Sequence, residues 1–227
     1  MDVIISERVR ARGAFLTSTI VKGAIIIKNR ADILEHSREL IRKILSTFSI
    51  ERLREHPILR AYRDFMWRLG IDPTKKRPSS EALIRRVLNK HEFPLKNNII
   101  DSANLASAET LVPIGIYDLN KIRGKVTLRF AYTNEIFIDV ATRKAENLSG
   151  KEIVLADENK VLHIFPHRDS ALSAIDDIPG KVIDVFIIGA GVPGVPLSLV
   201  KKAVELTAKY LHTYANAKEI SEVKVHR

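Results

Sequence analysis

Apolar positions recur along the chain with two different spacings, and each spacing predicts a different kind of element. Residues 13–28 are rich in apolar and β-branched side chains, which is typical of strands. Apolar residues then recur at helical spacing within 31–48 and again within 58–69, so both segments are predicted to be amphipathic helices. Gly70 and the pair Asp72–Pro73 follow the second helix, where a helix is expected to stop.

A third helix is expected to begin at Ser79 or Ser80, because a serine hydroxyl can cap the first turn. Glu81 then lies in the first turn, where a negative charge interacts favourably with the helix dipole. The two faces of this helix differ in character, one apolar and one basic. The predicted apolar face is Ala82, Leu83, Val87 and Leu88, and the basic face is Arg85, Arg86 and Lys90.

From residue 99 onward, short apolar and β-branched runs predict strands, followed by one last helix. That helix is entered at Pro196, because proline suits the first helical turn. Helices first, strands in the middle and a final helix indicate an α+β fold. No segment has the composition of a linker, so residues 1–227 are expected to form a single domain. The predicted strands cover residues 99–100, 125–132, 136–140, 152–156, 161–165 and 181–188.

The amino-acid composition excludes several kinds of site and indicates the environment of the protein. A chain of 227 residues can bury roughly 70% of its unfolded surface without metals or disulfides. It contains no cysteine, which excludes disulfides, cysteine-bound zinc and thiol catalysis. There is no glutamine and there are only two methionines, whereas Lys, Arg, Glu and Ile are plentiful. This profile favours a protein from a hot environment, with chance bias in a mesophile protein as the alternative.

The net charge of +10 is concentrated in one region. Residues 51–96 carry 12 Lys or Arg against 6 Asp or Glu, a surplus of 6. Such a surplus favours a polyanion partner, although a solubilising surface would have the same composition. The residues expected to position RNA phosphates are Lys75, Lys76, Arg77, Arg85, Arg86 and Lys90.

Other classes of protein have little support. The first residues lack the pattern of a signal peptide and the apolar runs are too short to cross a membrane, so a cytoplasmic protein is expected. His163 and His167 are four residues apart but in a strand and turn, where they would not share a helical face as zinc-binding histidines do. The glycine-rich segment 189–194 is interrupted by proline and is a poor dinucleotide fingerprint. No metal or cofactor is therefore expected.

Several short motifs in the middle of the chain keep a recognisable order. Asn97-Asn98-Ile99-Ile100-Asp101 is followed three residues later by Asn104, and Pro113 is followed four residues later by Tyr117-Asp118-Leu119. Arg77–Leu83 precedes these motifs, and Gly150–Asp157 and His167–Ser170 follow them. Together they resemble the tRNA-editing unit in the beta chain of phenylalanyl-tRNA synthetase, formed by its third and fourth modules.

The resemblance covers residues 54–210 and implies layered mixed β-sheets flanked by helices, with the strands and helix of residues 1–50 packed on this core. In that family the unit hydrolyses mischarged tRNA with a positioned water instead of a nucleophilic side chain. The resemblance thus implies a free-standing aminoacyl-tRNA deacylase that binds the acceptor end of tRNA, with a synthetase as a further partner. The family's pocket asparagine falls on Asn104; an asparagine that only closes a turn is the alternative.

Two positions depart from the family pattern. The family's pocket histidine falls on Gly115, and its pocket glutamate falls nearest Val185, in a strand without glutamate. A pocket without these partners cannot recognise a buried phenol hydroxyl by hydrogen bonding. Specificity for tyrosine is therefore not expected, which leaves either another amino acid or the loss of catalysis.

The remaining polar residues complete the candidate site. Glu109 is expected in an irregular segment, where polar residues tend to serve binding, and Asp101 at the end of a strand, where it could instead bond to backbone amides. The catalytic candidates are Asn104, Glu109 and His167, and the pocket candidates are Asp101, Gly115, Tyr117, Arg168, Asp169 and Val185. A non-catalytic RNA-binding module and a pocket protein for a free amino acid or other small molecule remain as alternatives.

Overall fold

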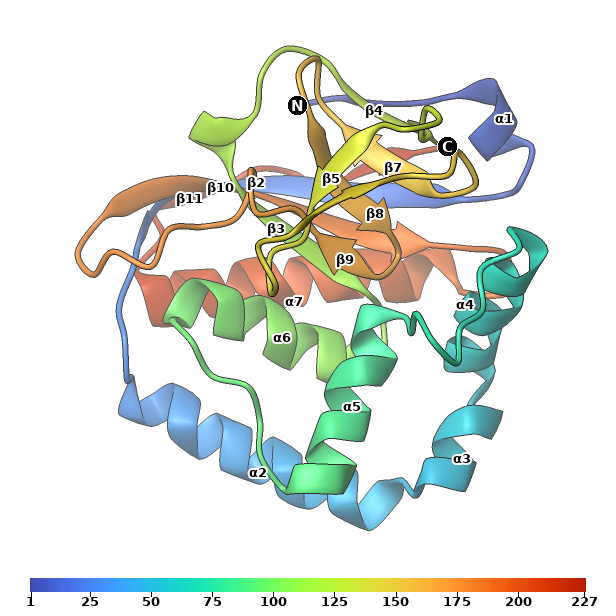
Figure 1. Cartoon of the computed structure of the whole chain (residues 1–227). Helices are drawn as coiled ribbons and strands as arrows, with labels where there is room; N and C mark the ends of the chain where they lie inside the picture. The colour runs from blue at the N-terminus through green and yellow to red at the C-terminus, as the bar shows by residue number, and fades with distance from the viewer.

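The computed structural model describes residues 1–227 and stacks two β-sheets on layers of helices (Figure 1). The central sheet is antiparallel and has the strand order β11-β2-β10-β3, with β12 also paired to β2. Its edge strand β3 is open on one side. The bounds are β2 Phe15–Ile25, β3 Ile114–Asp118, β10 Val182–Gly191, β11 Glu219–Ile220 and β12 Lys224–His226.

A second sheet covers one face of the central sheet, in the order β1-β4-β7-β8-β9. Only β1 and β4 are parallel. The two sheets meet where the ring of Tyr117 on β3 lies edge-on to His163 on β8, with centroids 6.4 Å apart. Strands β5 and β6 form a separate hairpin. The bounds are β1 Val3–Ile5, β4 Val126–Phe130, β5 Ile136–Ile138, β6 Ala145–Asn147, β7 Ile153–Ala156, β8 Val161–Phe165 and β9 Arg168–Asp169.

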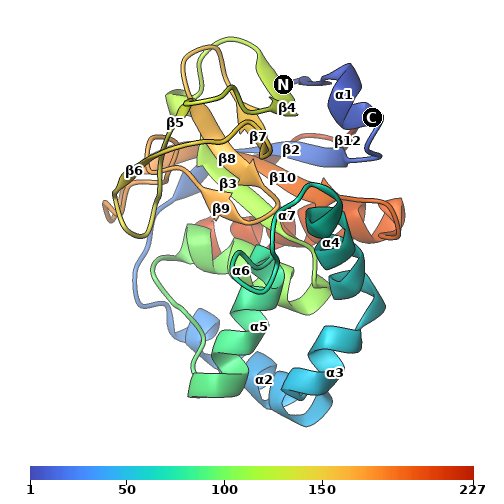
Figure 2. The same ribbon diagram turned by 45° about the vertical axis from the view of Figure 1, so that its right-hand side comes forward.

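Helices cover the other face of the central sheet (Figures 1 and 2). Helix α7 (Leu197–Ala215) packs directly on it: a Cβ at Gly189 of β10 would lie within 3.0 Å of side chains of α7. Helix α6 (Asn98–Thr110) lies beside α7, with α2 (Ala31–Thr47), α3 (Ile50–Glu55) and α5 (Ser79–Lys90) beyond it. Helix α4 (Pro57–Arg68) joins this layer to the sheets through Tyr62, whose hydroxyl donates to the carbonyl of Ala190 at 2.6 Å. Two short elements are α1 (Glu7–Arg10) and the 3₁₀ turn η1 (Leu119–Lys121).

The α+β class with layered sheets flanked by helices is confirmed, and so are most of the predicted elements. The exception is the strand predicted over Ile99–Ile100, which is wrong: both residues lie in the first turn of α6. The Asn97 side chain caps this helix by accepting from the backbone N–H groups of Ile99 and Ile100, both at 3.1 Å. Because most of α6 is buried on all sides, its apolar residues show no helical stripe.

The start of α5 also differs from expectation. Pro78 occupies the capping position, and Ser79 and Ser80 lie inside the helix without capping it. The buried face contains Ile84 and Val87, whereas Ala82 is exposed. Glu81 lies in the first turn, as predicted, but it is fully buried there and pairs with Arg63 and Arg85.

The N-terminal segment is an integral part of both sheets. Strand β2 lies in the middle of the central sheet, between β10 and β11, and β1 pairs with β4. Residues 1–50 therefore contribute strands to the sheets as well as helix α2. None of the helices combines the length and apolar character needed to cross a bilayer.

Candidate functional site

A cleft opens between helices α5 and α6, the open edge of β3, and the turn that joins β8 to β9. It consists of two adjoining cavities of about 280 Å³ and about 240 Å³. Three residues line both cavities and so mark their junction: Asn104, Ile114 and Asp169. Six of the ten residues that line the first cavity are polar, among them Ser79, Arg86 and His167. The second is mostly apolar and is lined by Ile100, Ala103, Ile116, Val140, Ala174 and Ile175 among others.

In the asparagine-rich motif at the start of α6, all but one of the polar side chains form hydrogen bonds within the protein. Asn97 caps the helix. The Asn98 side chain accepts from the N–H of Ile27 and donates to the carbonyls of Ile25 and Tyr214, each at 2.8 Å, so it ties α6 to β2 and α7. Asp101 accepts from the N–H of Lys96 at 2.7 Å.

Asn104 is the member of this motif that serves no such purpose. The hydroxyls on either side of it bond to main-chain carbonyls, Ser102 to Asn98 at 2.6 Å and Ser107 to Val112 at 2.7 Å. The half-buried amide of Asn104 instead faces the junction of the two cavities and forms no hydrogen bond within the chain. Such an amide offers both a donor and an acceptor to a ligand.

His167 contributes a second polar group with unused hydrogen-bonding capacity. It follows the cis peptide Phe165–Pro166 in the turn between β8 and β9, and only 8% of its surface is exposed. Both ring nitrogens lack a hydrogen-bond partner. Burial, reinforced by the nearby His163, Arg168 and Lys76, lowers the pKa of His167 to about 3. The ring is therefore neutral near pH 7, and its two nitrogens, one a donor and one an acceptor, are buried beside the first cavity.

Asp169 lines both cavities, as Asn104 does, and is held by β8, because its carboxylate oxygen is 2.9 Å from Nδ1 of His163. Tyr117 lies behind the cleft, between the two sheets. Its hydroxyl is buried without a hydrogen-bond partner, and burial, with the charge of Asp169 nearby, raises the pKa of the phenol. The phenol occupies the space in front of Gly115, where any side chain would collide with it.

The other candidate residues lie outside the cleft. Val185 is fully buried in the central sheet. Arg168 turns toward the β5–β6 hairpin, where it pairs with Asp139 and Glu146. Asp101 lines a different pocket, beside α2, and it lies in α6 and not at a strand end. Glu109 likewise lies in α6 and not in an irregular segment, and its carboxylate accepts from the Tyr210 hydroxyl at 2.8 Å and lies 2.9 Å from the His36 ring.

The basic residues fall into two groups. Arg86 lines the first cavity, and Lys75 and Lys76 line an adjacent open groove together with Lys151. Lys75, Lys76, Arg77, Arg86 and Lys90 are exposed on α5 and the loop before it, and none of these five residues forms an ion pair. Arg85 differs, because its side chain is only 14% exposed and lies 2.7 Å from the buried carboxylate of Glu81. Its charge is thus neutralised inside the protein.

The sequence did not single out the hydroxyl of Ser79 or the apolar lining of the second cavity as functional. Ser79 was interpreted as a helix cap, yet the residue lines the first cavity, and its buried hydroxyl has no hydrogen-bond partner. Ile114 and Ile116 on the open edge of β3 face the cleft, because alternate residues of a strand point to the same side. Nowhere do three or more His, Asp or Glu side chains converge in a way that could hold a metal ion.

The architecture is that of an α+β domain found in a tRNA synthetase subunit. The chain is similar in fold to an N-terminal fragment of the phenylalanyl-tRNA synthetase beta-subunit from Pyrococcus horikoshii, with a TM-score of 0.51 and 17% sequence identity. The similarity covers 96% of this chain and 49% of that fragment, so the chain spans about half of the fragment's length.

The sequence model of the B3/4 domain matches residues 61–222, and the chain therefore belongs to the B3/4 domain family. No curated protein matches the chain at significant similarity. The resemblance inferred from the short motifs is confirmed for the family and for the fold.

Proposed function

We propose that this chain binds the aminoacylated end of a tRNA in the cleft and hydrolyses the ester of mischarged tRNA in trans. The observation that carries the proposal is the free amide of Asn104 at the junction of a polar and an apolar cavity. The aminoacylated end of a tRNA also has a polar part and a second part that can be apolar. The polar nucleoside lies on one side of the ester, and the amino-acid side chain lies on the other.

The polar cavity suits the nucleotide. The Arg86 side chain supplies a positive charge for a phosphate, and the Ser79 hydroxyl and the neutral ring of His167 supply hydrogen bonds for the adenosine. The exposed lysines and arginines next to it extend this positive surface along the RNA backbone, and they would position the RNA without reading its sequence. These residues are Lys75, Lys76, Arg77 and Lys90.

The apolar cavity defines the expected amino acid class. Eight of its eleven lining residues are hydrophobic, and the polar groups, Lys96, Asn104 and Asp169, are the exceptions. An apolar side chain is stabilised when it moves from water into this cavity. The polar end of a polar side chain would instead lose its hydrogen bonds to water there. We therefore expect an ester of an apolar amino acid to be the substrate.

The chemistry is hydrolysis by a bound water. The water oxygen attacks the ester carbonyl carbon, the bond from that carbon to the ribose oxygen breaks, and a proton from the water passes to the ribose oxygen. The products are a free amino acid and an uncharged tRNA. Because the pKa of His167 is about 3, its ring is a weak base, and its role is to orient the water or the ribose by hydrogen bonding. Asn104 holds the ester or the ammonium group on the other side.

A second candidate function is RNA binding without catalysis. It is favoured by Gly115, where the family's pocket histidine is replaced and the space is filled by the Tyr117 phenol. In that case the cleft would hold the end of an RNA, and the exposed cations would supply the affinity.

A deacylation screen separates these functions. The chain is incubated with tRNAs charged with correct and incorrect amino acids, and release of the amino acid is compared for the wild type, Asn104→Ala and Asn89→Ala. Asn89 is exposed on α5 and does not line the cleft, so it is the matched control. The proposal expects release of one or a few apolar amino acids, lost in Asn104→Ala only. If no charged tRNA is hydrolysed while RNA binding stays salt-dependent, the chain is a binding module.

A further inference from the structure

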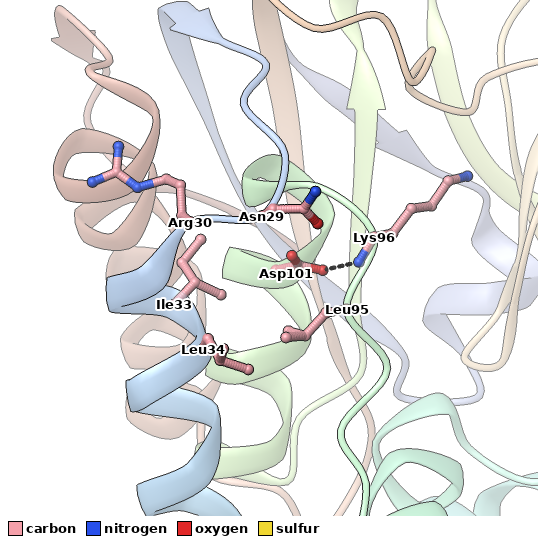
Figure 3. A pocket seen from close by; sticks show the side chains of 7 residues that line it. All are labelled: Asn29, Arg30, Ile33, Leu34, Leu95, Lys96 and Asp101. Atoms are coloured by element: carbon pink, nitrogen blue, oxygen red, sulfur yellow. Dashed lines mark hydrogen bonds between the residues drawn. The ribbon is translucent and has the colours of Figure 1, made fainter.

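A separate pocket lies between helix α2 and the start of α6 (Figure 3). Helix α2, helix α6 and the loop before α6 enclose it, and it shares only Lys96 with the cleft. Figure 3 shows the Lys96 and Arg30 side chains directed away from its interior, and Arg30 pairs with Asp32 at 2.9 Å. The pocket is lined by Asn29, Arg30, Ile33, Leu34, Leu95, Lys96 and Asp101.

The carboxylate of Asp101 is the group in this pocket that lacks a partner of opposite charge. The residue is only 5% exposed, and one carboxylate oxygen accepts from the N–H of Lys96. No lysine, arginine or histidine side chain forms an ion pair with it. Burial, with the negative charge of Asp177 nearby, raises the pKa of Asp101 to about 7. A buried carboxylate without a cation is rare in proteins, because an unpaired charge is costly to bury.

We propose that this pocket binds a small primary alkylammonium ion, with the ammonium on the Asp101 carboxylate and the alkyl chain against Ile33, Leu34 and Leu95. An ammonium group has three N–H donors. The free oxygen of Asp101 and the side-chain amide oxygen of Asn29, which lines the same pocket, can accept two of them. This site is independent of the cleft and of RNA binding.

The size of the pocket limits the ligand. Its volume is about 150 Å³. An engineered protein cavity of about this volume holds benzene, which has six heavy atoms. A chain of four or five carbons with one nitrogen therefore fits, whereas a branched polyamine does not. Leu34 and Leu95 are each 41% exposed, so the apolar end of the pocket is also its opening.

Calorimetric titration of the full chain with n-butylammonium at pH 8 tests the proposal, with 1-butanol as the uncharged ligand of the same length. We expect n-butylammonium to bind at least tenfold more tightly than 1-butanol, and Asp101→Asn to weaken its binding at least tenfold. Asparagine keeps an oxygen that can accept from the Lys96 N–H, so the local fold is preserved. Asp177→Asn is the matched control, because Asp177 is nearby but does not line the pocket, and it should bind n-butylammonium like the wild type.

A second variant makes the test independent of substitution at Asp101. Leu95→Ala removes part of the apolar wall at an exposed position, and it should weaken n-butylammonium binding by about threefold or more. The proposal is overturned if the wild type does not bind n-butylammonium, or if Asp101→Asn binds it equally well. Tenfold tighter binding of methylguanidinium would overturn the assignment to a primary ammonium.

Discussion

The phenol of Tyr117 fills the space in front of the Cα atom of Gly115, two residues earlier on the same strand. A Cβ atom at position 115 would collide with the hydroxyl oxygen and would lie only 2.7 Å from the ring carbon that bears it. Because Tyr117 is fully buried between the two sheets, its ring has no free space into which to move. The absence of a side chain at position 115 and the large ring at position 117 therefore depend on each other.

This dependence predicts a strong coupling between the two positions. Gly115→Ala should lower the free energy of unfolding by about 1–3 kcal/mol, because overpacking a buried site forces side chains out of their preferred positions. In a Tyr117→Leu background the same substitution should cost at least about 1 kcal/mol less. Urea unfolding of the four proteins measures both values. Equal costs in the two backgrounds would show that Tyr117 does not occupy the space at Gly115.

The adjacent residues Arg85 and Arg86 are predicted to have different roles. Arg85 neutralises the buried carboxylate of Glu81, whereas Arg86 is exposed at the cleft and unpaired. Arg85→Ala should destabilise the protein by roughly 1–3 kcal/mol, because removing a partner from a buried ion pair leaves its charge poorly compensated; Arg63 still contacts Glu81 and limits the loss. Arg86→Ala should leave the stability within about 0.5 kcal/mol.

RNA binding should show the reverse pattern. Arg86→Ala should weaken RNA binding and reduce the slope of log affinity against log salt concentration by about one, as expected for one lost phosphate contact. Folded Arg85→Ala should bind RNA like the wild type. Binding measured over a series of salt concentrations gives both results. A loss of affinity in Arg85→Ala with none in Arg86→Ala would place the RNA on a different surface.

The sequence could predict those features of the site that depend on residues close to one another in the chain. The basic helix and the free asparagine at position 104 follow from short motifs, and the structure places both at the cleft. The helical conformation of Ile99–Ile100 is also determined locally, by the Asn97 cap. Two β-branched residues in a row are typical of a strand, however, and this pattern outweighed the capping residue in the prediction.

The remaining features depend on residues distant in sequence. Glu109 is held by His36 and Tyr210, which are 73 and 101 residues away. Arg85 and Arg86 have the same side chain, and their roles differ because only Arg85 pairs with Glu81. Glu81 is itself buried beside Arg63, which belongs to another helix. No pattern within a single helix contains this information.

His167 predicts a specific dependence of stability on pH. Its pKa in the folded protein is about 3, whereas an unfolded histidine has a pKa near 6.5. The unfolded chain therefore binds more protons between these values, so the contribution of His167 is fully present above pH 6.5 and is lost as the pH falls toward 3. Between pH 6.5 and 4.5 the loss amounts to about 1–3 kcal/mol.

Replacement of the ring isolates this effect from that of other groups. His167→Gln should flatten the stability curve over this interval relative to the wild type, as measured by urea unfolding at half-unit steps of pH. Parallel curves for the two proteins would mean that the imidazole is not buried in its neutral form.

Asp101 predicts the opposite dependence. Its folded pKa of about 7 lies above the unfolded value near 3.9, so the folded state binds more protons between these values. Its charge therefore lowers the stability progressively as the pH rises from about 4 to 7. The two cations that line its pocket, Arg30 and Lys96, point away from the interior (Figure 3), and Arg30 pairs with Asp32. The nearby Asp177 carries a negative charge and pairs with Lys28.

The variant Asp101→Asn should consequently be more stable than the wild type by on the order of 1–3 kcal/mol at pH 8, and similar to it at pH 4. Thermal unfolding of both proteins at the two pH values measures this difference. A variant that is less stable at pH 8 would show that the ionised carboxylate has a favourable partner.

The most direct test of the account is the binding of a stable aminoacyl-adenosine analogue, in which an amide replaces the ester so that binding is observed without hydrolysis. We predict that an analogue with an apolar side chain binds the wild type and Asn89→Ala equally, and binds Asn104→Ala at least tenfold more weakly. We also predict that it perturbs the NMR signals of Asn104 and His167 and leaves those of Asp101 unchanged. Absence of binding, or equal affinity for Asn104→Ala, would contradict the proposal that the cleft receives the aminoacyl end of tRNA.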